Sequence, residues 1–307
     1  MAAQDSSPKV IFAALGANVA IAIAKFAAAM LTGSGAMLSE AIHSAVDSGN
    51  ELLLWLGLRQ AARPADELHP FGHGLRLYFW VFVVAVLIFG FGAVFSAIEG
   101  VRKIGHPEPV RDIAVNYGVL AVALGFESWS WWVAFGAFRE QQAAGGFFAA
   151  VRRSKDPTVF AVLFEDSAAL IGLLIALVGI SAAHFLDFPV ADGIASLGIA
   201  LVLAATALFL GIESQSLLTG EAALPEVRVS VAAIARAAPG VVALNQALTM
   251  HFGPSEVLAA ISLDFDDSRS AADIEAAVAE IEYAIKSAHP EVARVFVEAK
   301  SRSTASG

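Results

Sequence analysis

The sequence predicts a polytopic α-helical membrane protein with six transmembrane helices and a C-terminal ferredoxin-like α+β domain in the cytoplasm. Three observations predict this fold: a hydrophobic composition, a series of long apolar segments, and a change to soluble character near the C-terminus. Of the 307 residues, 57% are hydrophobic and 16% are charged, and the mean hydropathy is +0.69. This balance indicates that lipid is the solvent for much of the chain.

Six apolar segments are long enough to cross a hydrocarbon core of ~30 Å. The first is longer than the apolar core of a signal peptide and is followed by no clear cleavage pattern, so we expect it to be retained as a helix. Most of the breaks between segments contain Gly or Pro, which are expected where helices stop. The segments cover residues 10–31, 36–60, 75–104, 112–139, 157–180 and 189–213.

The distribution of Lys and Arg predicts the orientation, because cytoplasmic loops carry an excess of these residues. An N-terminus in the cytoplasm leaves only Arg102, Lys103 and Arg111 on the outer side. Six crossings then return the C-terminus to the cytoplasm as well. The expected location is a bacterial inner membrane. The inner side would carry Lys9, Arg59, Arg63, Arg76, Arg139, Arg152, Arg153 and Lys155.

The C-terminal part reads as a small soluble domain. A helical run over 226–238 is followed by two strand-like stretches (241–252 and 256–265), a long helical run (271–289) and a last strand (291–299). The order α-β-β-α-β is typical of a ferredoxin-like domain. We therefore expect a transmembrane domain over 1–215, a cytoplasmic domain over 222–300 and a disordered tail over 301–307.

Composition also limits the chemistry. The chain has no cysteine, so disulfides and thiolate metal ligands are unavailable and any metal site must use His, Asp, Glu, Asn or backbone oxygens. The formal charge of -10 argues against a nucleic-acid partner, which requires a basic surface.

Ionisable residues in the second segment point to a metal site, because such groups are costly in lipid. His43, Asp47 and Asn50 share one helical face, and Glu40 extends the same polar stripe. A histidine and a carboxylate at i, i+4 can chelate one divalent ion. The alternative is that His43 and Asp47 only satisfy each other by a hydrogen bond.

The fifth segment adds Glu165 and Asp166 in an apolar surrounding. Asp166 could complete a three-ligand site with His43 and Asp47, while Glu165, ~100° away on the helix, could join only from the side. The alternative is that one of these acids pairs with Lys25 of the first segment.

Two further places carry candidate residues. Asp66, His69 and His73, in the loop after the second segment, could bind a metal at the membrane surface, although loop histidines also have ordinary structural roles. Glu127 is an intramembrane proton site, a structural hydrogen-bonding group or an interfacial residue, since Trp129 and its neighbours indicate a nearby headgroup belt.

These residues resemble the cation diffusion facilitator (CDF) family of metal/proton antiporters. The matching stretches are SEAIHSAVDSGN at 39–50, HPFGHG at 69–74 and the acid Asp166. The six apolar segments and the C-terminal α-β-β-α-β order cover nearly the whole chain in the family's order. Within the family, the adjacent Glu-Asp of segment five is similar to the branch of the mitochondrial zinc transporter.

The resemblance implies a homodimer that exchanges a divalent metal for protons, with His43, Asp47 and Asp166 as ligands. The family's usual fourth ligand falls at Val162, and we expect Glu165 to substitute for it. Asp66, His69 and His73 match loop positions that bind a second metal in some members.

The resemblance implies less for the soluble domain. Its strands offer Asn245, Ser262, Glu298 and Lys300 where zinc-sensing members use His and Asp, so we expect a dimerisation platform with little or no metal of its own. His251 and His289 are expected to be surface or packing residues.

The function expected from these observations is export of Zn²⁺ from the cytoplasm by alternating access, with protons competing for the ligands. Mn²⁺, Fe²⁺, Co²⁺ and Ni²⁺ remain alternative substrates, and no tightly bound cofactor is expected. A non-transporting metal-responsive sensor or scaffold is a second class. An intramembrane metal hydrolase is a third class, and no H-E-x-x-H or similar signature supports an enzyme.

Overall fold

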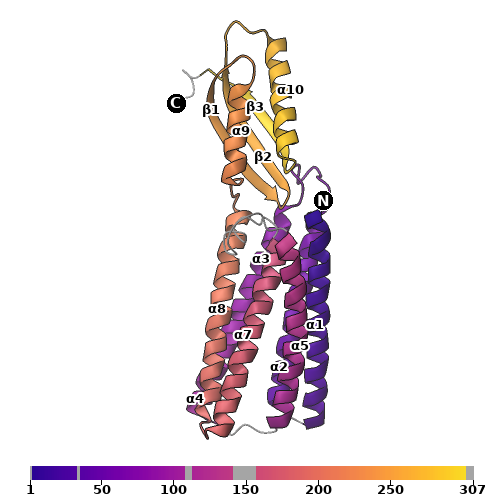
Figure 1. Ribbon diagram of the computed structural model, residues 1–307, viewed down its shortest axis with the longest axis vertical. Coiled ribbons are helices and arrows are strands. Elements are labelled where there is room, and N and C mark those ends of the chain that lie inside the picture. The colour runs from indigo at the N-terminus through magenta and orange to yellow at the C-terminus, as the bar shows by residue number, and fades with distance from the viewer. Residues whose placement is uncertain (1, 33–34, 108–112, 141–156, 302–307) are drawn as a thin grey trace. The chain divides into compact units, whose positions relative to one another are not determined.

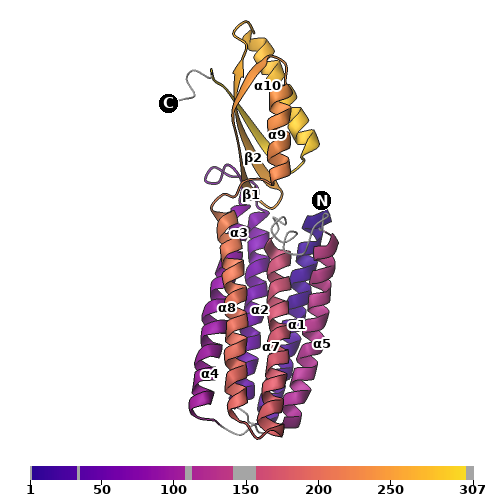
Figure 2. The ribbon, with the colours of Figure 1, turned by 60° about the vertical axis from the view of Figure 1, so that its left-hand side comes forward.

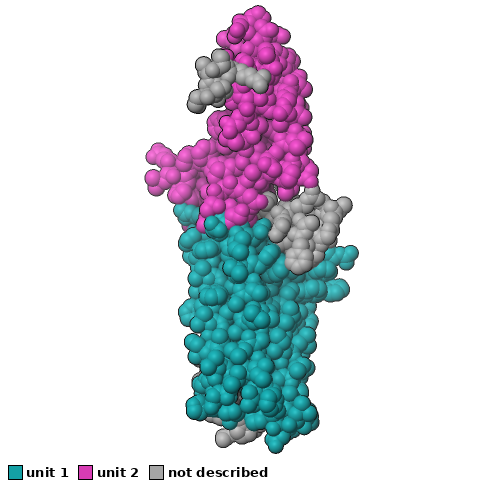
Figure 3. Space-filling view, turned by 90° about the vertical axis from the view of Figure 1, so that its left-hand side faces the viewer, with its two compact units in different colours: residues 1–60, 76–215 teal, residues 61–75, 216–307 magenta. Residues whose placement is uncertain are grey.

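The computed structural model describes residues 2–32, 35–107, 113–140 and 157–301. Two compact units make up the chain (Figure 3). The first contains residues 1–60 and 76–215, and the second contains residues 61–75 and 216–307. The expected tail beyond residue 301 lies outside the described residues.

The first unit is a bundle of long helices that run side by side (Figure 1). All six predicted apolar segments are helical, except that residue 112 is not described and Pro189 lies in a turn before its helix begins. A seven-residue π-helical stretch, η1, continues α3 into α4 without a break. The helices are α1 (Ala2–Thr32), α2 (Gly35–Ala61), α3 (Leu75–Leu87), η1 (Ile88–Val94), α4 (Phe95–Gly105), α5 (Ile113–Glu140), α7 (Pro157–Phe185) and α8 (Val190–Leu218).

Within the described residues, five helical stretches are long and apolar enough to cross a membrane: Pro8–Ala27, Leu75–Gly105, Ile113–Arg139, Pro157–Phe185 and Val190–Leu218. The helix α2 is not among the five, although it is 27 residues long. It carries several polar residues, including Asp47, Asn50 and Glu51.

An apolar cluster joins most of these helices at one level of the bundle. Leu54 of α2, Val81 of α3 and Phe160 of α7 are fully buried in it, together with Phe138 of α5 and Leu210 of α8. Leu54 comes one helical turn after Asn50, so the cluster borders the polar residues of α2 directly. At a different level, Gly193 lets α8 approach α4, because an added Cβ there would lie 2.8 Å from Ile104 Cγ1.

The second unit has the predicted α-β-β-α-β order: α9 (Pro225–Ala237), β1 (Val241–Gly253), β2 (Glu256–Phe265), α10 (Ala271–Ala288) and β3 (Val292–Ala299). The sheet order is β1-β2-β3. β1 and β2 form an antiparallel hairpin with Ala247 opposite Ile261, whereas β2 and β3 are parallel, with Ala259 opposite Val295. A parallel neighbour requires a crossover, and α10 provides it.

Both helices of this unit cover the same face of the sheet (Figure 2). Along β2 the buried residues alternate with partly exposed ones, as a strand packed on one face requires. Ile261 and Leu263 of β2 meet Val231 of α9 and Ile281 of α10 in the core. A reciprocal capping box between Ser270 and Asp273 starts α10.

Candidate metal centre

The first unit holds several buried ionisable side chains. Lys25, Glu51, Glu127 and Asp166 are each exposed by less than 9%, and Glu51 is fully buried. Ionisable groups at such positions are costly and usually mark an ion pathway or a proton relay. The question is which of them the tertiary structure brings together.

Hydrogen bonds join α2, α5 and α7 through the candidate residues. Asn50 Nδ2 on α2 donates to Glu165 Oε1 on α7 at 3.0 Å. Ser130 Oγ on α5 donates to Asp166 Oδ2 on α7 at 2.6 Å. The predicted proximity of the second and fifth segments is therefore present, and α5 contributes a hydroxyl group that the sequence analysis did not identify.

Carboxylates gather around these hydrogen bonds. Asp47, which is half-buried, lies close enough to Glu51, Glu127, Glu165 and Asp166 to interact with each of them electrostatically. So many negative groups in a low-dielectric interior repel one another unless cations or protons compensate them. The arrangement is therefore suited to binding a cation.

Glu51 is the residue of this group that sequence reasoning missed. It is fully buried, and it interacts electrostatically with Asp47, Glu165 and Asp166. A signal was present, because Glu51 follows Asp47 by four residues and so continues the polar face of α2. The stripe extends in both directions from Asp47, not only toward His43.

Two of the predicted residues cannot be placed in the site by their side chains. His43 and Glu40 lie within α2, but their side chains are outside the described part of the chain. Val162, at the position of the family's fourth ligand, is fully buried in the apolar cluster one turn before Asp166. An apolar side chain cannot bind a metal at that position. The acid of α7 nearest to Asp166 in the sequence is Glu165.

The side chain of Lys25 approaches the site from α1. Its Nζ donates to Ser44 Oγ of α2 at 2.8 Å, and it lies near enough to Glu127 to interact electrostatically. The hydrogen bonds described for Glu165 and Asp166 come from Asn50 and Ser130.

Glu127 points inward on α5. It is 8% exposed, whereas Trp129 and Trp132 on the same helix are 52% and 71% exposed. Trp131 also turns inward and donates from Nε1 to Ser167 Oγ of α7 at 2.9 Å. The exposed indoles therefore do not place Glu127 at the surface of the bundle.

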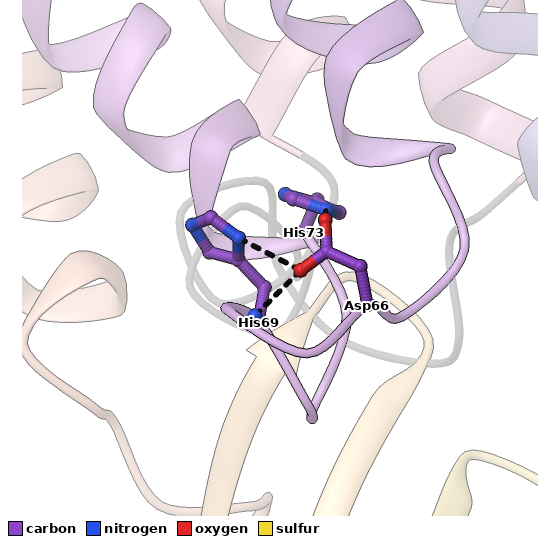
Figure 4. Close-up of side chains that lie close together, drawn as sticks. All are labelled: Asp66, His69 and His73. Carbon is purple, nitrogen blue, oxygen red and sulfur yellow. Dashed lines mark hydrogen bonds and ion pairs between the residues drawn. The ribbon is translucent and has the colours of Figure 1, made fainter.

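The loop between α2 and α3 forms a compact cluster (Figure 4). Asp66 lies between the two imidazoles: its Oδ1 is 3.2 Å from His69 Nδ1, and its Oδ2 is 3.0 Å from His73 Nε2. One ligand atom from each residue lies within 4.8 Å of the others, and among the described residues this is the one group of three such ligands at that spacing. The acids of α2 and α7 do not converge this closely within the described structure.

Backbone N–H groups also donate to the carboxylate of Asp66. The N–H groups of Leu68 and His69 donate to Oδ1 at 3.0 and 2.7 Å. Donation from the His69 backbone, and then from the His73 and His69 side chains, lowers the pKa of Asp66 to about 2. A carboxylate that stays ionised is a ready metal ligand.

The loop packs against the sheet of the second unit. The Phe71 and Phe252 rings stack at a centroid distance of 5.1 Å, and the Arg294 guanidinium lies over Phe71 at 5.4 Å. Arg294 Nη2 also donates to the Pro70 carbonyl at 3.2 Å. Gly74 permits this approach, because an added Cβ would lie 2.2 Å from the Phe252 carbonyl oxygen.

The sheet positions singled out from the sequence are engaged in the fold. Asn245 Nδ2 donates to the Lys300 carbonyl at 2.8 Å, and Ser262 pairs with Glu298 in the β2–β3 register. His251 is buried and His289 is half-buried.

A bundle of apolar helices that encloses interacting carboxylates defines an integral membrane protein. The chain belongs to the cation efflux family, also called the CDF family: the family's transmembrane domain matches residues 11–219. The resemblance drawn from residues 39–50, 69–74 and Asp166 is thereby confirmed.

Several relatives share most of this chain. It is 32% identical over 260 residues to "Proton-coupled zinc antiporter SLC30A9, mitochondrial" from Xenopus laevis and from Homo sapiens, over 84% of this chain and 46% of each relative. It is 27% identical over 246 residues to "Cation-efflux pump FieF" from Escherichia coli O1:K1 / APEC, over 77% of this chain and 74% of the relative. The chain thus spans about half the length of the mitochondrial relatives.

Proposed function

We propose that this chain is a proton-coupled Zn²⁺ antiporter that exports the ion from the cytoplasm by alternating access and works as a homodimer. The observation that carries the proposal is the group of carboxylates enclosed by α2, α5 and α7 in a chain of the cation efflux family. Relatives that are named proton-coupled zinc antiporters cover 84% of the chain and support the choice of ion and of coupling.

The transport site consists of His43 and Asp47 on α2 with Asp166 and Glu165 on α7. Zn²⁺ binds a neutral imidazole and ionised carboxylates, so protons compete with it for every ligand. On the more acidic side of the membrane, protonation of the ligands releases the ion and loads the site for the return step. Asn50, Glu40 and Glu127 are accessory residues of this site.

The membrane domain covers residues 1–215 and has six spans, with α2 as the sixth helix. At ~1.5 Å per residue, 27 residues extend about 40 Å, which exceeds a ~30 Å hydrocarbon core. The polar residues of α2 are compatible with a span because Asn50 and Glu51 are buried, whereas Leu52 is 50% exposed. Both termini lie in the cytoplasm, and the membrane is a bacterial inner membrane.

Residues 222–300 form a ferredoxin-like cytoplasmic domain that serves as a dimerisation platform, followed by a disordered tail over 301–307. Asp66, His69 and His73 form a second metal position in the loop. Their spacing supports this role, and so does His73 Nδ1, which is buried and has no hydrogen-bond partner in the described part of the chain.

The deciding experiment is zinc uptake into proteoliposomes under an imposed pH gradient. Wild-type protein should take up Zn²⁺ in response to the gradient, and Asp47→Ala and Asp166→Ala should lose that uptake while remaining folded. Competition with Mn²⁺, Fe²⁺ and Co²⁺ tests the ion, and preferential transport of one of these would replace zinc as the substrate. Absence of flux from well-folded wild type would support a sensor or scaffold instead.

A further inference from the structure

A group of buried oxygen atoms next to the proposed transport site has no hydrogen-bond donor within the described residues. The atoms are Asn50 Oδ1, Glu51 Oε1, Glu51 Oε2 and Glu165 Oε2. Glu51 is fully buried and Asn50 is 2% exposed. His43, whose side chain is not described, precedes Glu51 by eight residues, or ~12 Å along the helix axis, and so lies two turns away from it on α2.

These oxygens belong to one place in the bundle. Asn50 and Glu51 are consecutive on α2, and Asn50 Nδ2 donates to Glu165 Oε1 across to α7 at 3.0 Å. Among the charged neighbours of Glu51, Glu165 interacts with it most strongly. The hydrogen bond holds the Asn50 amide against the Glu165 carboxylate, and Glu51 follows Asn50 directly on α2 and interacts electrostatically with Glu165.

Every unsatisfied atom of this group is an acceptor. A buried acceptor without a donor is costly, and two buried carboxylates that interact electrostatically add repulsion. A divalent cation removes both costs at once, because it coordinates carboxylate and amide oxygens and compensates their charge. Zn²⁺ accepts carboxylate oxygens as ligands, so an all-oxygen position remains open to it.

We propose that Asn50, Glu51 and Glu165 form a second position for the transported cation, one turn along α2 from the position at His43, Asp47 and Asp166, with Glu51 as a direct ligand. This inference rests on the proposed transport function. The two positions are separated by ~6 Å along α2, and Glu165 contributes to both. The next turn of α2 contains Leu54, which is fully buried in the apolar cluster. The second position therefore lies where the polar face of α2 ends and the apolar cluster begins.

The absence of cysteine from the chain makes the position directly testable. Cobalt(II) bound to a thiolate gives an intense charge-transfer absorption in the near-ultraviolet, and wild-type protein cannot produce it. We would titrate the full chain in detergent with Co²⁺ as wild type and as the single variants Glu51→Cys and Asn50→Cys. Ser214→Cys, at a fully buried residue of α8, is the matched control.

Glu51→Cys and Asn50→Cys should each develop the absorption and reach a plateau as Co²⁺ is added, whereas Ser214→Cys should not develop it. Folded Glu51→Cys without the absorption would overturn the ligand role. If that variant does not fold, Asn50→Cys decides by the same criterion. Zinc uptake by Glu51→Gln gives an independent measurement: uptake should be lost, and uptake at the wild-type rate would overturn the proposal.

The same measurements separate this inference from the proposed function. Wild type without any zinc flux would contradict the antiporter, whatever the cobalt spectra show. If wild type transports zinc while the folded Glu51→Cys and Asn50→Cys variants show no cobalt–thiolate absorption, the antiporter proposal stands and the second position is refuted.

Discussion

Asn50 on α2 and Glu165 on α7 are joined by a hydrogen bond of 3.0 Å between residues 115 positions apart. The bond fixes which oxygen of Glu165 turns toward α2 and leaves Oε2 without a described donor. Glu165, which the sequence predicted to join the site only from the side, is therefore held beside α2 by the neutral amide of Asn50. This relationship, the hydrogen bond of Ser130 to Asp166 and the contacts of the loop between α2 and α3 lead to four predictions.

Replacing Asn50 with Leu should lower zinc uptake by about tenfold or more, because a hydrogen bond to a charged group contributes about 1.5–3 kcal/mol. Initial rates of uptake into proteoliposomes would measure the effect, with protein homogeneity checked by size exclusion. Asn50→Asp keeps the size of the side chain but removes the amide donor, so it should also be impaired. Wild-type rates in both variants would show that the bond to Glu165 has no part in transport.

Ser130→Ala should weaken zinc binding by about 10- to 100-fold, the usual effect of removing a group that orients a metal ligand. Ser130 Oγ is the donor that holds Asp166 Oδ2 at 2.6 Å. Zinc titration of the purified protein would measure the change. Ser128→Ala, at an exposed serine of the same helix, is the matched control and should bind as wild type does. Equal affinities for the two variants would refute the orienting role.

Asp66→Asn should remove zinc binding at the loop, whereas Glu67→Gln, at the adjacent exposed acid, should not. The pKa of Asp66 is lowered to about 2, mainly by donation from the His69 backbone. A lowered pKa means that the ionised form is stabilised in the fold. The ionised Asp66 carboxylate therefore adds its full contribution to the free energy of unfolding above the pKa of the unfolded state, ~3.9. That contribution is lost as the pH falls toward 2.

The loop should consequently keep its Asp66 hydrogen bonds from pH 8 to about 5. Nuclear magnetic resonance of ¹³C-labelled aspartate would follow the carboxyl group of Asp66 directly. A titration midpoint near 4 for this carboxyl would contradict the backbone donation seen here.

Gly74→Ala should separate the loop from the C-terminal end of β1, because the new Cβ would lie 2.2 Å from the Phe252 carbonyl oxygen and 2.9 Å from Gly253 Cα. Hydrogen exchange of the full chain should become faster across both segments. Gly118→Ala in α5 is the control, since a Cβ there meets no atom within 4 Å. Unchanged exchange in Gly74→Ala would mean that the loop does not pack against the sheet in solution.

Much of the architecture follows from local pattern. The apolar segments are helical because a long apolar run satisfies its backbone only within itself in lipid. The limits of β1, β2, α10 and β3 agree closely with the predicted ranges. They are set by turn residues and by the alternation of apolar and polar side chains, which can be recognised within a few neighbouring residues. The sequence also identified Asp47, Glu165 and Asp166, because an acid in an apolar run is visible without any structure.

Other features depended on which helices and strands meet. The π-helical stretch Ile88–Val94 lies inside a long apolar run without charged residues, and its two glycines, Gly90 and Gly92, do not by themselves predict a change in helical hydrogen bonding. The burial of Glu51 and Val162 depends on the helices that pack against α2 and α7. Arg294 reaches Pro70 across 224 positions, and such a contact leaves no local trace.

The sequence by itself determined the helices, the order of helices and strands along the chain, and the acids within apolar segments. Each of these depends on the periodicity of neighbouring residues or on the cost of an acid in an apolar segment. Only the tertiary structure decided which donors those acids have, that Glu51 joins them, and that the Asp66 loop packs on the sheet. Those outcomes depend on contacts between distant segments, whose geometry is set by packing and not by local preference.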